Sequence, residues 1–141
     1  MPTFPKALRA NGYRTAAVVA NPNVSRTFGF GQGFEAFRFL RQRNRSHLLN
    51  REALAWLDGL DGAAPFFLYV HTVDPHDPYD PPPAERARFA PGESAAWAAS
   101  TGRLLRELRR GDVVVTPELV ARLRALYDGE IVRTDEGALL W

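Results

Sequence analysis

Apolar residues along the chain fall into two short continuous runs and several longer segments with helical spacing. The first run, residues 14–20 (RTAAVVA), predicts a strand that ends at the turn-forming residues 21–23 (NPN). The second, residues 66–72 (FFLYVHT), is an uncharged run of β-forming residues, which predicts a strand buried on both faces of a sheet.

The longer segments place apolar residues three and four positions apart, as one face of a helix requires. The predicted helices cover residues 3–11, 46–60, 84–89, 94–110 and 116–141. Thr3, Ser46 and Thr116 stand where N-caps are expected, and Pro117 suits a first helical turn. Residues 113–115 (VVV) are too short to be assigned as a strand.

The order strand, helix, strand predicts a βαβ unit with parallel strands. We therefore expect an α/β fold, with a mainly parallel sheet flanked by helices. Residues 28–37 alternate glycine and phenylalanine and contain G-x-G, but no helix follows in the context that a dinucleotide site needs. We interpret them as a loop whose glycines let the backbone turn.

The composition is that of a soluble globular domain of 141 residues, with a formal charge of only +2. No apolar run approaches the ~20 residues of a membrane span, and the first residues lack a signal-peptide pattern, so the compartment is not indicated. The absence of cysteine excludes disulfides, thiolate metal sites and a cysteine nucleophile within these residues.

Seventeen of the 18 basic residues are arginine, and Lys6 is the one lysine. Arginine stays protonated far above neutral pH, which explains a pI of about 9.4 beside a small net charge. Residues 41–45 (RQRNR) form a basic patch without the interleaved aromatic residues or recognition helix of a nucleic-acid site. We interpret it as a solvated loop and predict no nucleic-acid partner.

Polar side chains follow directly on the second predicted strand, in a segment spaced by prolines. They are His71, Asp74, His76, Asp77 and Asp80, with prolines at positions 75, 78 and 81–83. Ligands of parallel sheets bind just past the carboxyl ends of the strands, so this is where chemistry is expected. Because proline fixes φ, we expect the loop to be stiff and extended.

Three interpretations of the two histidines stay open from the residues alone. They can donate to a charged ester oxygen or protonate a leaving group, or His71 can be a core residue and His76 a turn residue. A metal site is disfavoured, because an extended loop does not bring its side chains to one point. Asp135 shares a helix face with Tyr127, Ile131 and Leu139, and a structural role is favoured over a catalytic one.

Residues 66–79 (FFLYVHTVDPHDPY) resemble the middle segment of the sulfatases, in the alkaline phosphatase superfamily. Residues 8–16 (LRANGYRTA) resemble the helix and Gly-Tyr-x-Thr entry into a strand, and residues 29–34 (GFGQGF) the glycine and phenylalanine turn of bacterial members. Residues 127–135 (YDGEIVRTD) resemble the long helix before the second metal motif. The resemblance implies part of an alkaline-phosphatase-like sandwich.

The resemblance also implies hydrolysis of a sulfate ester, in which formylglycine attacks sulfur and a bound calcium ion holds the sulfate oxygens. The histidine of the family's Pro-His-x-Pro-type motif matches His76, which is the expected catalytic and substrate-binding residue. His71 is expected to line the same pocket as a second substrate-binding residue. No residue of this segment is expected to bind the metal by itself.

The departures from the family pattern concern the nucleophile and the metal. No Cys or Ser is followed by x-Pro-or-Ala-x-Arg, there is no early aspartate pair, and no aspartate is followed by His or Asn. Gly137 stands two residues after Asp135, where the family usually has a glycine four residues after. We therefore expect residues 1–141 to be the central part of a sulfatase catalytic domain, cut at both ends and inactive alone.

Two other classes of function remain. The same superfamily includes phosphoryl transferases, such as phosphoethanolamine transferases, which use a threonine nucleophile with zinc or manganese. A non-catalytic, basic anion-binding remnant is the third class. The sequence does not indicate the leaving group or the oligomeric state.

Overall fold

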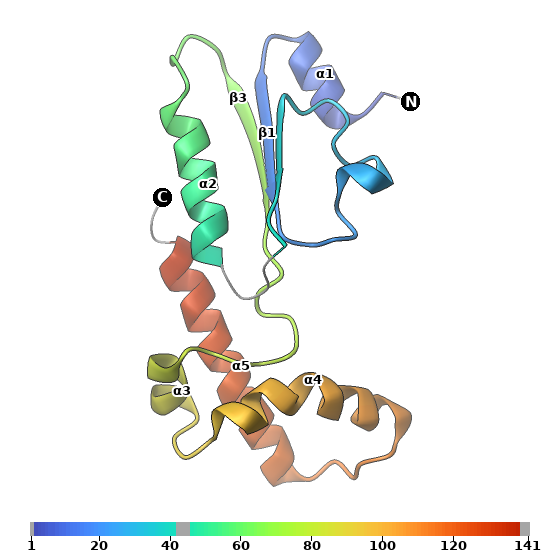
Figure 1. Ribbon diagram of the computed structural model, residues 1–141, viewed down its shortest axis with the longest axis vertical. Coiled ribbons are helices and arrows are strands. Elements are labelled where there is room, and N and C mark those ends of the chain that lie inside the picture. The colour runs from blue at the N-terminus through green and yellow to red at the C-terminus, as the bar shows by residue number, and fades with distance from the viewer. Residues whose placement is uncertain (1, 42–45, 139–141) are drawn as a thin grey trace. The chain divides into compact units, whose positions relative to one another are not determined.

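The computed structural model describes residues 2–41 and 46–138 (Figure 1). The chain divides into two units, the first ending at Val73 and the second beginning at Asp74. Residues 42–45 of the predicted basic patch lie outside the described residues. None of the helices in the described part of the chain has the length and apolar character to cross a membrane.

The first unit combines a parallel sheet with helices, which confirms the predicted α/β class. Its elements are α1 (Phe4–Ala10), β1 (Arg14–Val19), η1 (Arg26–Phe28), β2 (Ala36–Phe39), α2 (Ser46–Asp58) and β3 (Phe66–His71). Among the described residues, three strands form the sheet in the order β2-β1-β3, and both neighbouring pairs are parallel. The predicted parallel pairing of β1 with β3, with a helix between them in sequence, is therefore confirmed.

The core of the first unit lies between β1 and α2. Residues 15–20 are almost fully buried, because β1 has a strand on each side and α2 packs against it (Figure 1). Leu49 and Ala53 of α2 pack with Val18 of β1, and all three are at most 2% exposed. The small residues of β1 let the helix approach the sheet closely.

The prediction that residues 66–72 are buried on both faces is wrong. In β3, Phe66 is 50% exposed and Tyr69 is 38% exposed. The reason is the position of β3 in the sheet: it pairs with β1 on one side and is an edge strand of the sheet that the structure describes. The strand with a neighbouring strand on each side is β1, although its apolar side chains are smaller than those of β3.

Strand β2 was not predicted, because its residues lie in or next to the segment that we expected to be a loop. Residues 36–39 pair in parallel with β1, from Ala16 opposite Ala36 to Val19 opposite Phe39. Four residues are too few for a periodic pattern, and the pairing with β1 determines their conformation. The preceding glycine-rich segment is a loop as predicted, with one 3₁₀ turn, η1.

The loop before β2 is fastened to α1. The Thr3 hydroxyl donates a hydrogen bond to the Gln32 carbonyl oxygen (3.1 Å) and does not cap α1, contrary to expectation. The Lys6 Nζ donates to Gln32 Oε1 (2.9 Å). The helix and the loop therefore hold each other in place through Gln32.

The second unit contains three helices among its described residues. They are α3 (Pro83–Phe89), α4 (Ala95–Arg110) and α5 (Pro117–Ala138). Ser94 Oγ accepts a hydrogen bond from the Trp97 amide (3.1 Å), and Thr116 Oγ1 accepts one from the Leu119 amide (3.2 Å), so Thr116 is a cap as predicted. A small core forms where Ala98 and Leu126, each 0% exposed, pack together.

The predicted face of the last helix is not its buried face. Tyr127 and Ile131 are 37% and 36% exposed, Asp135 is exposed, and Leu139 lies outside the described residues. The face that packs inward carries Leu126 and Glu130. The side chain of Asp135 therefore faces solvent.

Candidate functional site

His71 ends β3 at the carboxyl edge of the sheet, where parallel sheets bind ligands. Its carbonyl oxygen accepts a hydrogen bond from the Ala20 amide (2.9 Å), which fixes the backbone against the end of β1. Its Nδ1 lies 2.9 Å from the Tyr69 hydroxyl, two residues earlier on the same face of the strand. His71 is therefore held in place by both its backbone and its ring.

His76 belongs to the second unit and lies in the proline-rich loop, with a side chain that is 63% exposed. Its Nδ1 lies 2.8 Å from Asp77 Oδ1 and 2.8 Å from the Asp77 carbonyl oxygen. With a proton on Nδ1, the ring donates to Asp77, and Nε2 is the nitrogen that can meet a ligand. Asp77 thus sets the orientation and the tautomer of the ring.

The loop is not the extended segment that its prolines suggested. It turns at residues 74–75 and bends at residues 77–78, and the Asp74–Pro75 and Asp77–Pro78 peptide bonds are cis. Proline restricts φ but leaves ψ open, so a proline-rich segment can turn as well as extend.

Hydrogen bonds and an ion pair tie the loop to the helices of its unit. The Tyr79 amide donates to Thr101 Oγ1 (2.7 Å), whose hydroxyl donates in turn to the Ala98 carbonyl oxygen of α4 (2.8 Å). Asp80 Oδ1 lies 3.2 Å from Arg86 Nη1 of α3. Thr101 is fully buried, so its hydroxyl stabilises the loop in a site shielded from water.

Two glycines inside helices let the loop approach closely. A Cβ at Gly102 of α4 would lie 3.5 Å from Pro78, and a Cβ at Gly129 of α5 would lie 3.1 Å from Pro81. Glycine in a helix interior costs about 1 kcal/mol relative to alanine. The approach of the loop to Gly102 is an ordinary contact, whereas the approach to Gly129 needs the space that the missing Cβ leaves. The prolines of the loop fill that space.

Glu130 on α5 is a buried charged group that was not among the predicted site residues. It is 1% exposed, and neither of its carboxylate oxygens has a hydrogen-bond partner at ordinary distance and angle. Burial, followed by the nearby Asp74 carboxylate, raises the pKa of Glu130 to about 7, and the Asp80 amide and Arg133 oppose this rise only in part. Its position four residues after Leu126 puts the two on one helix face, but the sequence does not show that this face is the buried one.

The expected site residues are distributed over both units. His71 lies in the first unit, whereas His76 and the three aspartates of the loop lie in the second. Within the described ranges, no three histidine, aspartate or glutamate side chains are arranged to hold a metal ion. These residues do not fit the calcium site that the resemblance implies, and no step through calcium is assigned to them.

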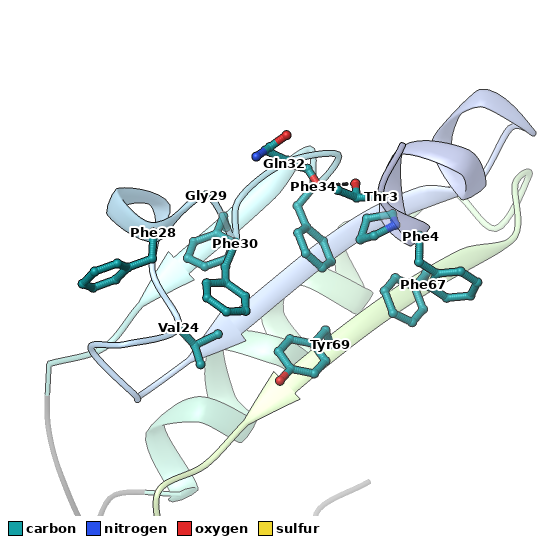
Figure 2. A pocket seen from close by; sticks show the side chains of 12 residues that line it. Thr3, Phe4, Val24, Phe28, Gly29, Phe30, Gln32, Phe34, Phe67 and Tyr69 are labelled. Carbon is teal, nitrogen blue, oxygen red and sulfur yellow. Dashed lines mark hydrogen bonds between the residues drawn. The ribbon is translucent and has the colours of Figure 1, made fainter. Parts of the chain in front are cut away.

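An apolar cavity of about 450 Å³ lies in the first unit, on the face of the sheet turned away from α2 (Figure 2). It is lined by Thr3, Phe4, Pro5, Val24, Phe28, Gly29, Phe30, Gln32, Phe34, Phe37, Phe67 and Tyr69. Tyr69 is the one titratable residue in this lining, so the cavity can bind apolar groups but offers no acid or base near neutral pH. Tyr69 links the cavity to the candidate site, because it lines the cavity and its hydroxyl lies 2.9 Å from His71 Nδ1.

Comparison with known families gives one match. The family model described as Sulfatase matches residues 1–137. No curated protein and no solved structure was found to match the chain. The family match covers nearly the whole chain and includes both histidines and the loop that follows β3. The chain belongs to the sulfatase family.

Proposed function

We propose that residues 1–141 are the central part of a sulfatase catalytic domain, and that the intact protein hydrolyses a sulfate ester. The observation that carries this proposal is the His76 loop: an exposed imidazole oriented by Asp77, on a segment anchored to α3 and α4. The family match over residues 1–137 supports the choice of sulfate esters over other anions.

In the proposed site, His76 donates a proton through Nε2 to the oxygen of the leaving group. Cleavage of the ester bond builds negative charge on that oxygen, and a positioned imidazolium both offsets the charge and supplies the proton. Asp77 keeps Nδ1 occupied, so the reacting nitrogen is always Nε2. His71, at the carboxyl edge of the sheet, is proposed as a second substrate-binding residue.

The remaining chemistry is not assigned to these residues. In the family, formylglycine supplies the nucleophile and calcium holds the sulfate. The sequence of this segment lacks the nucleophile motif, and residues 2–41 and 46–138 offer no fitting set of calcium ligands. We therefore expect the segment alone to be inactive. Turnover of an aryl sulfate by a chain of these residues alone would contradict this expectation.

The test is to read the genomic sequence on both sides of this segment and to assay the intact reading frame with His76→Ala. We expect kcat for a sulfate ester to fall about 10²–10⁴-fold, because the general acid is removed. His47→Ala, on the exposed surface of α2, is the matched control and should leave kcat unchanged. Unchanged turnover in His76→Ala would remove His76 from the mechanism.

The flanking sequence separates the alternatives. A Cys or Ser followed by x-Pro-or-Ala-x-Arg supports the sulfatase proposal, whereas a threonine nucleophile and turnover of phosphate esters would move the protein to the phosphoryl transferases. If neither nucleophile is encoded, the anion-binding remnant takes the place of both. Salt-dependent binding of polyanions that survives His76→Ala would then be expected.

A further inference from the structure

The two histidines of the candidate site differ in the group that their Nδ1 atoms contact. His71 Nδ1 lies 2.9 Å from the hydroxyl of Tyr69, a neutral group that has one proton to donate. His76 Nδ1 lies 2.8 Å from Asp77 Oδ1 and 2.8 Å from the Asp77 carbonyl oxygen, and an ionised carboxylate and a carbonyl only accept. In both rings Nε2 is the nitrogen left for a ligand, and whether it carries a proton depends on the partner of Nδ1.

The hydrogen bond between Tyr69 and His71 has a preferred direction. An unprotonated imidazole nitrogen accepts through an in-plane lone pair, whereas the lone pair of a phenol oxygen is partly delocalised into its ring, so the nitrogen is the stronger acceptor. If Nδ1 donated instead, the hydroxyl proton would need another acceptor. Among the described residues no second partner of the Tyr69 hydroxyl is found, so water would have to accept that proton. Donation from Tyr69 to Nδ1 is therefore favoured, and it leaves the proton of a neutral His71 on Nε2.

The Tyr69 ring is itself held in place on the sheet. It packs on Phe34, with ring centroids 6.4 Å apart and planes 31° apart (Figure 2), and it meets the His71 ring edge to face at 6.0 Å. Tyr69 and His71 are two residues apart on β3, so they project from the same face of the strand. The pairing of β3 with β1, in which Val19 lies opposite His71, fixes the backbone under both rings.

We propose that Tyr69 is a positioning residue that gives the neutral His71 the opposite tautomer to that of the neutral His76. His71 then presents an Nε2–H group, which donates a hydrogen bond to an anionic oxygen without itself being charged. The neutral His76 presents an unprotonated Nε2, which can take up a proton and return it. The first ring is suited to bind the sulfate group and the second to transfer a proton. The assignment to sulfate rests on the proposed function, but the tautomers do not.

The tautomers are measured from the ¹⁵N chemical shifts of the imidazole rings in the 141-residue chain, made with ¹⁵N-labelled histidine. The spectra are recorded at about pH 9, where an ordinary imidazole is neutral, and His→Gln variants assign the signals of the three histidines. We expect the proton almost entirely on Nε2 in His71 and on Nδ1 in His76. A His71 ring protonated on Nδ1, or with the mixed tautomers of free histidine, would overturn the proposal, and so would the same tautomer in both rings.

The role of Tyr69 is tested with Tyr69→Phe, which keeps the aromatic ring and removes the hydroxyl. We expect the His71 signals to move toward the mixed tautomers of free histidine, while the His76 signals stay unchanged. The matched control is Tyr13→Phe, directly before Arg14, at the opposite end of β1 from the residue that pairs with His71. It should leave both rings as they are. A His71 tautomer that is unchanged in Tyr69→Phe would overturn the proposal.

In the intact enzyme, two substitutions of His71 distinguish a neutral donor from an acid. Glutamine offers an uncharged N–H group but cannot transfer a proton. We expect KM for the sulfate ester to rise about 10–100-fold in His71→Ala, as for the loss of one hydrogen bond to a charged group, and much less in His71→Gln, with kcat kept in both. A loss of kcat in His71→Gln would make His71 an acid and overturn the proposal.

Failure of the proposed function has a different result. If the intact protein turned over no sulfate ester while both tautomers stood as assigned, the proposed function would fail and the role of Tyr69 in positioning His71 would remain.

Discussion

The acidic residues of helix α5 lie in two different environments, exposed to water and buried. Asp128 and Glu136 are exposed and keep their hydration, whereas Glu130, between them in sequence, is almost fully buried. A buried carboxylate without hydrogen bonds favours the protonated form, so folding draws a proton onto Glu130. The stability of the second unit must then depend on pH around neutrality.

The direction of that dependence follows from the raised pKa. Because the pKa of Glu130 is about 7 in the folded chain and near 4.5 when unfolded, its stabilising effect is complete below about pH 4.5 and is lost as the pH rises through 7. The free energy of unfolding should fall by on the order of 3 kcal/mol between these limits. Urea unfolding at a series of pH values measures this, and Glu130→Gln should flatten the curve.

The sequence identifies His76 but not Glu130, for a physical reason. His76 lies in a continuous motif, and its orienting partner Asp77 is the next residue. Glu130 comes near the loop from a distant part of the chain, and its own neighbours, Gly129 and Ile131, do not show that it is buried. Burial of a single helical residue depends on which elements pack against it, and that information is tertiary.

Among the secondary structure elements, the helices were predicted well and the strands less well. The cap predicted at Thr116 and the spacing of α4 are local signals, which single sequences contain, whereas the side-chain cap predicted at Thr3 does not form. Whether β3 is central or at an edge depends on how many strands lie beside it, and β2 forms because β1 is available to pair with it. Neither the edge position of β3 nor the formation of β2 can be predicted from the residues of the strand itself.

The close packing of Gly129 on α5 against Pro81 of the loop can be tested by substitution. Gly129→Ala places a methyl group 3.1 Å from the rigid, buried ring of Pro81, so we expect a loss of about 1–3 kcal/mol despite the better helix propensity of alanine. Gly102→Ala meets Pro78 at 3.5 Å, an ordinary contact, and should be neutral or stabilising. Thermal unfolding of both variants makes the comparison, and equal effects would contradict it.

At the scale of the whole molecule, each of the two units has its own buried cluster. Val18, Ala20, Leu49 and Ala53 form one, and Ala90, Ala98 and Leu126 form the other. Both clusters are small and rich in alanine, so a single large side chain contributes a considerable share of each.

We expect Leu49→Ala and Leu126→Ala each to cost about 2–5 kcal/mol, because each removes a fully enclosed side chain. Hydrogen exchange should show Leu49→Ala lowering protection mainly up to Val73, and Leu126→Ala mainly from Asp74 onward. Equal loss of protection in both units after either substitution would show that they unfold as one.

The hydrogen bond between Lys6 and Gln32 has a practical consequence for the aromatic cavity. Lys6 is the one lysine side chain, and the Gln32 that it meets also lines the cavity. In the 141-residue chain with its α-amino group blocked, an amine-reactive, polarity-sensitive dye would therefore attach at a single lysine, beside a cavity lined by six phenylalanines. Its emission would report whether that cavity holds water or an added aromatic compound.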